Sequence, residues 1–213
     1  MRQIDIQNWS RRDRFYKFSE FDHPHFNICA NIDLTRFRPV QMGREISFTA
    51  AIVYLVARTA NSIPEFRYRI RGQRVIEHEV VHPSVTVLVG GDVFSYCAVD
   101  YAEDFPVFAQ GMKDRIAQVR ENPTVVDKPG VDDRLFMSAM PWVSFTSVMH
   151  PLNLNPPDSV PRFAWGKFFE EGQFLKMPLS VQAHHALLDG IHLGRFYALL
   201  QDYLDHPEDV LFN

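Results

Sequence analysis

Short runs in which apolar and polar residues alternate dominate the hydrophobic pattern of this 213-residue chain. A period of two is typical of strands with one buried face. The runs predict strands at 26–34, 85–89, 93–99, 136–147 and 162–182, and a hairpin at 68–79. Glycine-containing turns are expected at 71–73, at 90–92 and at 170–173, where the run 162–182 would fold into a pair of strands.

Four segments have a helical pattern instead. A short helix is predicted to begin near Ser10, whose hydroxyl can cap it, and the other three span 48–62, 104–120 and about 191–204. The strands outnumber the helices and do not alternate strictly with them. This order favours an α+β or layered sandwich fold over a doubly wound parallel sheet.

The chain shows no internal repeat, and its loop-like stretches at 121–134 and 150–161 are too short to separate two domains. We therefore expect one domain over 1–213. With 46% hydrophobic and 13% aromatic residues, the chain can bury a sizeable core.

The charge and the apolar runs limit the class of partner and the location. A net charge of −4 argues against a general nucleic-acid binder. No stretch approaches the roughly 20 apolar residues needed to cross a bilayer, and the first residues lack the apolar run of a signal peptide. Cys29 and Cys97 form no CxxC pair, so a reducing, cytoplasmic location is expected.

The segment 183–192 contains the densest group of chemically active residues: His184, His185, Asp189 and His192 around an Asp-Gly turn. A neutral imidazole held on a rigid turn can act as a general base. The spacing of His185, Asp189 and His192 also permits a metal site, although Gly190 would break the helix that would align them. Histidines bonded to backbone within a packed turn are the third interpretation.

The motif His184-His185-Ala186-Leu187-Leu188-Asp189-Gly190 resembles the HHxxxDG signature of the chloramphenicol acetyltransferases, which dihydrolipoamide acyltransferases share. Three further segments in matching order support the chloramphenicol branch: NWSRR with Phe15 at 8–15, SAMPWVSF at 138–145, and MPLSVQ at 177–182. The resemblance covers nearly the whole chain. It implies the fold of CoA-dependent acyltransferases, a two-layer sandwich of a mixed β-sheet with helices packed on it.

The resemblance also implies roles for four residues. His185 matches the general base that deprotonates the acceptor hydroxyl, and Ser138 matches the serine that stabilises the oxyanion. Asp189 and Arg11 match an ion pair that holds the histidine turn. The family works as a homotrimer with the active site between subunits, uses acetyl-CoA as co-substrate and needs no metal.

The residues of both substrate pockets match the family less closely than the catalytic residues do. On the acceptor side Phe94 is kept, whereas Lys17, Phe18, Phe136, His150 and Ala164 differ from what the family leads us to expect. On the CoA side Lys167 is kept, while Ser47 and Thr49 replace a lysine and a tyrosine. These departures indicate a different or broader acceptor.

The expected function is therefore acetyl-CoA-dependent O-acetylation of a small hydrophobic acceptor. Chloramphenicol is the leading candidate, and antibiotic resistance is the implied role. The same chemistry on another acceptor is a close alternative. A non-catalytic trimer that sequesters a ligand and a metal-dependent hydrolase are more distant ones.

Overall fold

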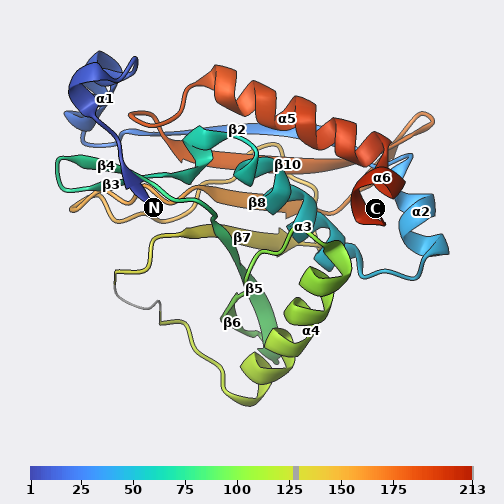
Figure 1. Ribbon diagram of the computed structural model, residues 1–213. Helices are drawn as coiled ribbons and strands as arrows, with labels where there is room; N and C mark the ends of the chain where they lie inside the picture. Colours follow the sequence, from blue (N-terminus) through green and yellow to red (C-terminus); the bar gives the residue numbers. More distant parts are fainter. Residues whose placement is uncertain (127–129, 213) are drawn as a thin grey trace.

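A mixed seven-stranded sheet forms the centre of the computed structural model, which describes residues 1–126 and 130–212 (Figure 1). Its strands, in spatial order, are β2 (His25–Asp33), β10 (Phe174–His184), β8 (Arg162–Gly166), β7 (Arg134–Met140), β5 (His82–Gly90) and β6 (Val93–Ala98), with β9 (Phe169–Glu171) paired to β10. The β5–β7 and β7–β8 pairs are parallel and the others antiparallel. The α+β fold favoured by the strand pattern and the mixed sheet implied by the resemblance are both confirmed.

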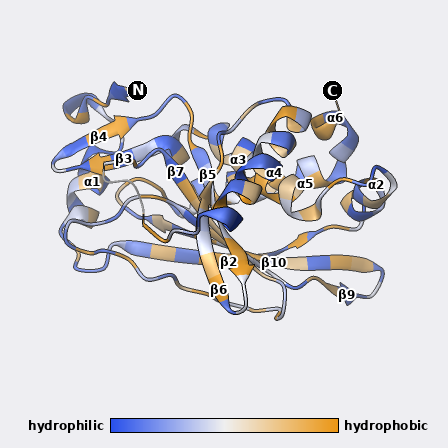
Figure 2. Ribbon diagram, turned by 90° about the horizontal axis from the view of Figure 1, so that it is seen from below, coloured by the Kyte–Doolittle hydropathy of each residue, from blue (hydrophilic) through white to orange (hydrophobic). Residues whose placement is uncertain are grey.

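The helices α3, α4 and α5 lie on one side of this sheet, as Figure 2 shows. The α-helices are α1 (Arg12–Ser19), α2 (Phe37–Gly43), α3 (Phe48–Asn61), α4 (Phe105–Glu121), α5 (Gly190–Asp205) and α6 (Pro207–Leu211), with 3₁₀ turns η1 (Ile6–Asn8) and η2 (Pro64–Arg67). A second, three-stranded sheet contains β1 (Arg2–Gln3), β4 (Arg74–Glu77) and β3 (Tyr68–Arg71). Its hairpin turns at Gly72, whose φ of +62° suits a residue without a side chain.

The core lies between the helices and the sheet because helix and strand patterns both supply an apolar face there. Helix α3 begins at the cap Ser47, whose side chain accepts a hydrogen bond from the Ala50 N–H, and it is buried along most of its length. From the sheet, Leu179 and Val181 of β10 are fully buried in the same core. Helix and sheet therefore bury one another, which stabilises both.

The alternate residues of the strands lie on the opposite face of the sheet. The strand registers align Ser138 with Ala164, Ala164 with Ser180, and Ser180 with Cys29. Because side chains alternate along a strand, these residues share the face turned away from the helices. Ser138, which is half-buried, therefore points away from the helices.

The structure corrects several predicted boundaries. The strand predicted at 136–147 ends at Met140, because Pro141 has no N–H to continue the ladder. The hairpin predicted at 68–79 ends at Glu77, and the run predicted at 162–182 continues to His184. The short elements α2, α6 and β1 were not foreseen, since such short segments carry too little periodic signal.

The remaining predicted elements agree with the structure within a few residues. The helix expected near Ser10 begins at Arg12, and those expected at 48–62, 104–120 and 191–204 are α3, α4 and α5. The predicted cap by the Ser10 hydroxyl is wrong, because the N-cap of α1 is Arg11 and no side chain caps this helix. The loop expected at 150–161 contains only an isolated bridge between Leu154 and Pro157. Of the loop expected at 121–134, residues 127–129 lie outside the described residues. No helix in the described part of the chain is long and apolar enough to span a membrane.

Candidate active site

The turn between β10 and α5 holds His185 at the end of the sheet. Its backbone N–H donates to the Pro24 carbonyl over 2.8 Å, which ties the turn to the segment before β2. The Leu187 and Leu188 N–H groups both donate to the carbonyl of His184. The turn therefore fixes the backbone on which the imidazole is mounted.

The His185 ring is fixed by aromatic packing on α1 and β2. It stacks on Phe18 with ring centroids 3.9 Å apart and an interplanar angle of 5°, and its centroid lies 4.5 Å from that of Phe26. Its Nδ1 lies 3.1 Å from the Leu188 carbonyl oxygen. A carbonyl can only accept a hydrogen bond, so in the neutral ring this contact requires the proton on Nδ1 and leaves the lone pair on Nε2. The side chain remains 31% exposed, so this lone pair belongs to an accessible ring.

Asp189 links the turn to α1 through Arg11. Both Arg11 Nη atoms donate to the Asp189 carboxylate, Nη2 over 3.2 Å to Oδ1, and Nη2 also donates to the His185 carbonyl over 3.3 Å. The Asp189 Oδ1 lies 3.2 Å from the His185 Nδ1. The hydrogen bond from Arg11 lowers the pKa of Asp189, which therefore stays ionised.

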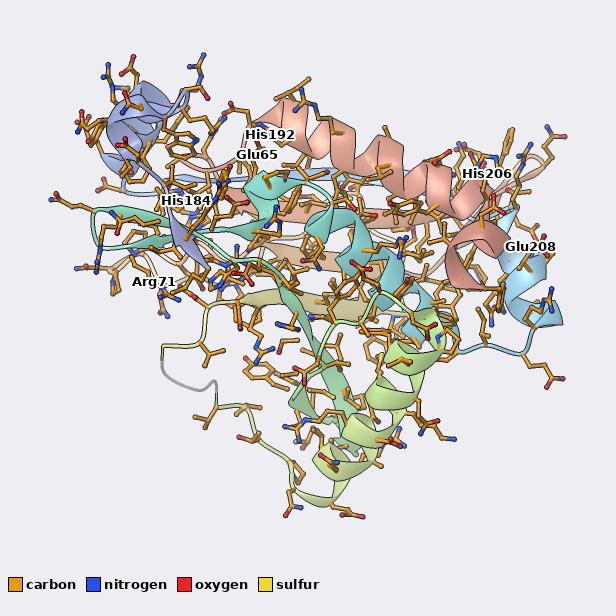
Figure 3. The ribbon with its side chains drawn as sticks, viewed as in Figure 1. Glu65, Arg71, His184, His192, His206 and Glu208 are labelled. Atoms are coloured by element: carbon orange, nitrogen blue, oxygen red, sulfur yellow. The ribbon has the colours of Figure 1, made fainter. Side chains whose placement is uncertain are left out.

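The other two histidines of the motif are bonded within the fold. His184 is 1% exposed, its Nδ1 accepts from the Ala186 N–H over 3.2 Å, and burial lowers its pKa to about 3. His192 accepts the Asp189 N–H at Nδ1 over 2.8 Å, and its Nε2 lies 3.5 Å from Glu65 (Figure 3). Among the described residues, no three His, Cys, Asp or Glu side chains are arranged to hold a metal ion.

A second group of expected residues surrounds Ser138. A pocket of about 250 Å³ opens there on the sheet face turned away from the helices, and it is lined by Ser84, Thr86, Phe94, Tyr96, Phe136, Met137, Ser138, His150, Pro151 and Arg162. The Ser138 hydroxyl lies 3.1 Å from that of Thr86. Three residues expected on the acceptor side, Phe94, Phe136 and His150, thus lie around the same pocket as Ser138.

Within one chain, Ser138 and His185 are far apart. Ser138 is level with Ser180 of β10, across β8, and His185 lies five positions further along the chain. At about 3.3 Å per residue and about 4.8 Å between strands, their Cα atoms are separated by roughly 15–20 Å. No single hydroxyl group can lie at hydrogen-bond distance from both side chains of the same chain.

The other expected residues lie at separate places. Ala164 is fully buried in β8 and does not line the Ser138 pocket. Lys17 lies over the Phe21 ring, with Nζ 5.4 Å from its centroid. Lys167 is exposed just after β8, where its N–H donates to the Val143 carbonyl over 2.8 Å.

The two CoA-side positions that differ from the family, Ser47 and Thr49, line another cavity. This cavity, of about 530 Å³, lies between the start of α3 and helix α4. Its α4 wall includes two cations, Lys113 and Arg120. Lys167 is not among its lining residues.

Several residues of the site were missed by sequence reasoning. Thr86 orients the Ser138 hydroxyl, Phe26 packs on the His185 ring, and Arg162 lines the pocket. Thr86 is the polar position in the otherwise apolar strand 85–89, and this exception was the signal. Phe26 and Arg162 have no local signal, because their roles depend on which strands become neighbours.

Comparisons with known proteins show the family of the chain. The family model for chloramphenicol acetyltransferase matches residues 1–201. A chloramphenicol acetyltransferase from Klebsiella sp. is 33% identical over 205 residues, which cover 95% of this chain and 93% of the relative. Another, from Bacillus pumilus, is 28% identical over 213 residues, which cover 99% of this chain and 96% of the relative.

Solved structures share the fold. A chloramphenicol acetyltransferase structure superimposes with a TM-score of 0.84 at 27% identity, covering 95% of this chain and all of that one. A dihydrolipoamide acetyltransferase from Azotobacter vinelandii superimposes with a TM-score of 0.70 at 16% identity, covering 93% of this chain and 88% of that one. At this identity the match shows only that the two proteins share a fold. The match along nearly the whole length, together with the shared fold, places the chain in the chloramphenicol acetyltransferase family, as an acyltransferase.

Proposed function

We propose that this protein transfers the acetyl group of acetyl-CoA to a hydroxyl of a small acceptor, with chloramphenicol the leading candidate. The observation that carries the proposal is the geometry of His185: an accessible imidazole with Nδ1 bonded to a carbonyl and the Nε2 lone pair free. A neutral base of this kind suits removal of a hydroxyl proton. In this role the protein would be a cytoplasmic, single-domain enzyme of antibiotic resistance.

In the proposed reaction, the acceptor oxygen replaces CoA on the acetyl carbon. The carbon–sulfur bond of the tetrahedral intermediate breaks, and the CoA thiolate leaves with the proton that His185 Nε2 has taken. That proton comes from the acceptor hydroxyl, and Nε2 takes it as the hydroxyl oxygen attacks the acetyl carbonyl. The imidazole becomes positively charged in this step, and Asp189 lies 3.2 Å from its Nδ1. An ionised carboxylate at this distance stabilises the imidazolium and keeps the ring in the productive tautomer. Arg11 in turn keeps Asp189 ionised and in place.

Ser138 is proposed to donate a hydrogen bond to the carbonyl oxygen, which gains negative charge as the acceptor attacks. If Thr86 donates to Ser138 Oγ, the Ser138 proton is free to point into the pocket. Loss of one such donor typically costs about 3–4 kcal/mol of transition-state stabilisation.

The active site is proposed to form between subunits of a homotrimer. The separation of Ser138 and His185 within one chain supports this arrangement, because a site that uses both must combine His185 of one subunit with Ser138 of a neighbour. The exposed apolar side chains of β5, β6 and the segment that follows β7 support it as well. They include Leu88, Val93, Phe94, Trp142, Val143 and Met149, each at least 45% exposed in the single chain.

The cavity between α3 and α4 is a candidate site for part of acetyl-CoA. Its lining combines apolar Ala109, Met112 and Ile116 with the cations Lys113 and Arg120. This combination fits a molecule that carries both an aromatic base and phosphates. Lys113 and Arg120 would supply the charge that a lysine provides in the family where this chain has Ser47.

The test is release of free thiol from acetyl-CoA, with and without chloramphenicol. The wild type should release thiol only when the acceptor is present. His185→Ala should lower this rate by a factor of about 10² to 10⁴, because the base contribution is lost. His206→Ala, which changes an exposed histidine at the far end of α5, is the matched control and should retain the rate.

Two results would contradict the proposal. Absence of chloramphenicol-dependent thiol release by the folded wild type would remove chloramphenicol as acceptor. A near-normal rate in folded His185→Ala would remove His185 as the base. Circular dichroism and thermal unfolding of each variant show whether a lost rate reflects lost chemistry or a lost fold.

A further inference from the structure

We infer that His150 is a specificity-determining residue, and that it selects acceptors carrying a neutral hydrogen-bonding group such as an amide or a second hydroxyl. This inference rests on the proposed function, since it concerns the acceptor pocket of the same site. It goes further by assigning the chemical class of a second group on the acceptor. The argument depends on the position of His150, its charge state and the charges around it.

His150 is held in the wall of the Ser138 pocket by its backbone. Its N–H donates to Gln182 Oε1 over 2.9 Å, and Pro151, which follows, also lines the pocket. The attachment to β10 fixes the backbone of His150 relative to Ser138. The imidazole is therefore anchored in the pocket wall but can still turn about its own side-chain bonds.

The His150 imidazole has hydrogen-bonding capacity that the described residues do not use. Its Nε2 is buried and has no hydrogen-bond partner among them. Buried polar atoms without a partner are rare in folded proteins, and a bound group or water usually completes them. The torsion about Cβ–Cγ of histidine is broad, so a polar group entering the pocket can turn a ring nitrogen toward itself.

The ring is neutral under ordinary conditions. Burial, and then the nearby Arg162 guanidinium, lower the pKa of His150 below its usual value. A neutral imidazole offers one donor and one acceptor, which an amide or a hydroxyl can match. A purely apolar group beside the ring would leave the donor and the acceptor of the imidazole unpaired, which weakens binding.

No unpaired charge faces the acceptor from the described lining of the pocket. Arg162 is the one charged lining residue, and its guanidinium donates to the Asp158 carboxylate and to the Val160 carbonyl. Its face also lies 5.1 Å from the Phe136 ring centroid. A carboxylate on the acceptor would find no free cation here, so the pocket favours a neutral polar group.

The inference is tested with three alcohols that share one skeleton: 3-phenylpropan-1-ol, 4-(3-hydroxypropyl)benzamide and 4-(3-hydroxypropyl)benzoate. Their affinities are measured by calorimetry on His185→Ala protein, which binds without turnover. The benzamide should bind about tenfold more tightly than the other two, the effect of one good hydrogen bond. Adding His150→Leu should remove the preference, and adding His206→Leu should keep it.

Equal affinities for the three alcohols, absence of binding by all of them, or tightest binding of the benzoate would overturn the inference. So would a benzamide preference that survives His150→Leu. Parallel thiol-release assays with chloramphenicol on protein that retains His185 separate the two proposals. If chloramphenicol is not acetylated but the benzamide preference depends on His150, only the proposed reaction is rejected. If chloramphenicol is acetylated but the preference does not depend on His150, only the role of His150 is rejected.

Discussion

Two adjacent histidines of the same motif have opposite environments. His184 is 1% exposed and burial lowers its pKa to about 3, whereas the His185 side chain is 31% exposed. Along a strand, neighbouring side chains point to opposite faces, and β10 ends between these two residues. The position of the strand end therefore decides which imidazole can reach a substrate.

The Arg11–Asp189 pair gives a prediction for stability. Asp189→Asn removes the ionic component of the bond while keeping the shape, and should lower the free energy of unfolding by about 1–2 kcal/mol. For a chain of this length that corresponds to a fall in Tm of about 2–8 °C, measured by calorimetry. Activity should fall with it, because the turn that mounts His185 is loosened.

The same pair has a defined pH dependence. The pKa of Asp189 is lowered in the folded state, so its stabilisation is complete above the unfolded value of about 4 and is lost as the pH falls through the folded pKa. The Tm difference between wild type and Asp189→Asn should be full at pH 7 and shrink toward pH 3. A constant difference over this range would show that the carboxylate charge is not its source.

At the scale of elements, the segment 141–150 depends on contact with the end of β8. A Cβ added at Gly166 would lie 2.8 Å from the Val143 carbonyl oxygen, 2.9 Å from Pro178 and 3.0 Å from Phe145. The segment that leads to His150 therefore packs against a strand end that has no side chain. Glycine is required there for close approach rather than for its backbone angles.

Gly166→Ala should displace this segment and destabilise the protein by about 1–3 kcal/mol. Acceptor KM should rise more than kcat falls, since His150 moves with the segment. Gly111→Ala in the exposed middle of α4 is the matched control, because nothing lies within 4 Å of its added Cβ. It should be neutral or stabilise by up to about 1 kcal/mol. Identical Tm changes in the two variants would show that close packing at Gly166 is unimportant.

At the scale of the whole molecule, the two main residues of the proposed site, His185 and Ser138, lie at separate places on the sheet. His185 lies at the end of β10, while Ser138 lies on the open face of β7, beside the acceptor-side residues Phe94, Phe136 and His150. Under the proposed mechanism, a single chain therefore holds only part of each site. Its proposed activity depends on a neighbouring copy.

Mixed subunits test this dependence. His185→Ala and Ser138→Ala proteins, each weakly active, are unfolded together and refolded as a mixture. If each site combines residues of two chains, about one quarter of the sites in an equal random mixture regain both residues. Thiol release should then exceed the sum of the separate variants. Absence of recovery, in mixtures that sedimentation shows to be trimers, would place both residues in the same chain's site.

The sequence alone determined much of this protein. The period of two predicted most strands of the mixed sheet, the apolar pattern predicted α3, and the histidine motif predicted the turn that carries His185. These features are local, because side-chain alternation, capping and turn chemistry depend on residues close together in the chain.

Only the tertiary structure decided the environment of each candidate. It buried His184 and left His185 accessible, brought Thr86 of β5 to Ser138 of β7, and placed His150 against Gln182 of β10. It also separated Ser138 from His185, although both lie in segments that resemble the same family. Strand order and register set these relations, and they arise from long-range packing that no short stretch of residues encodes.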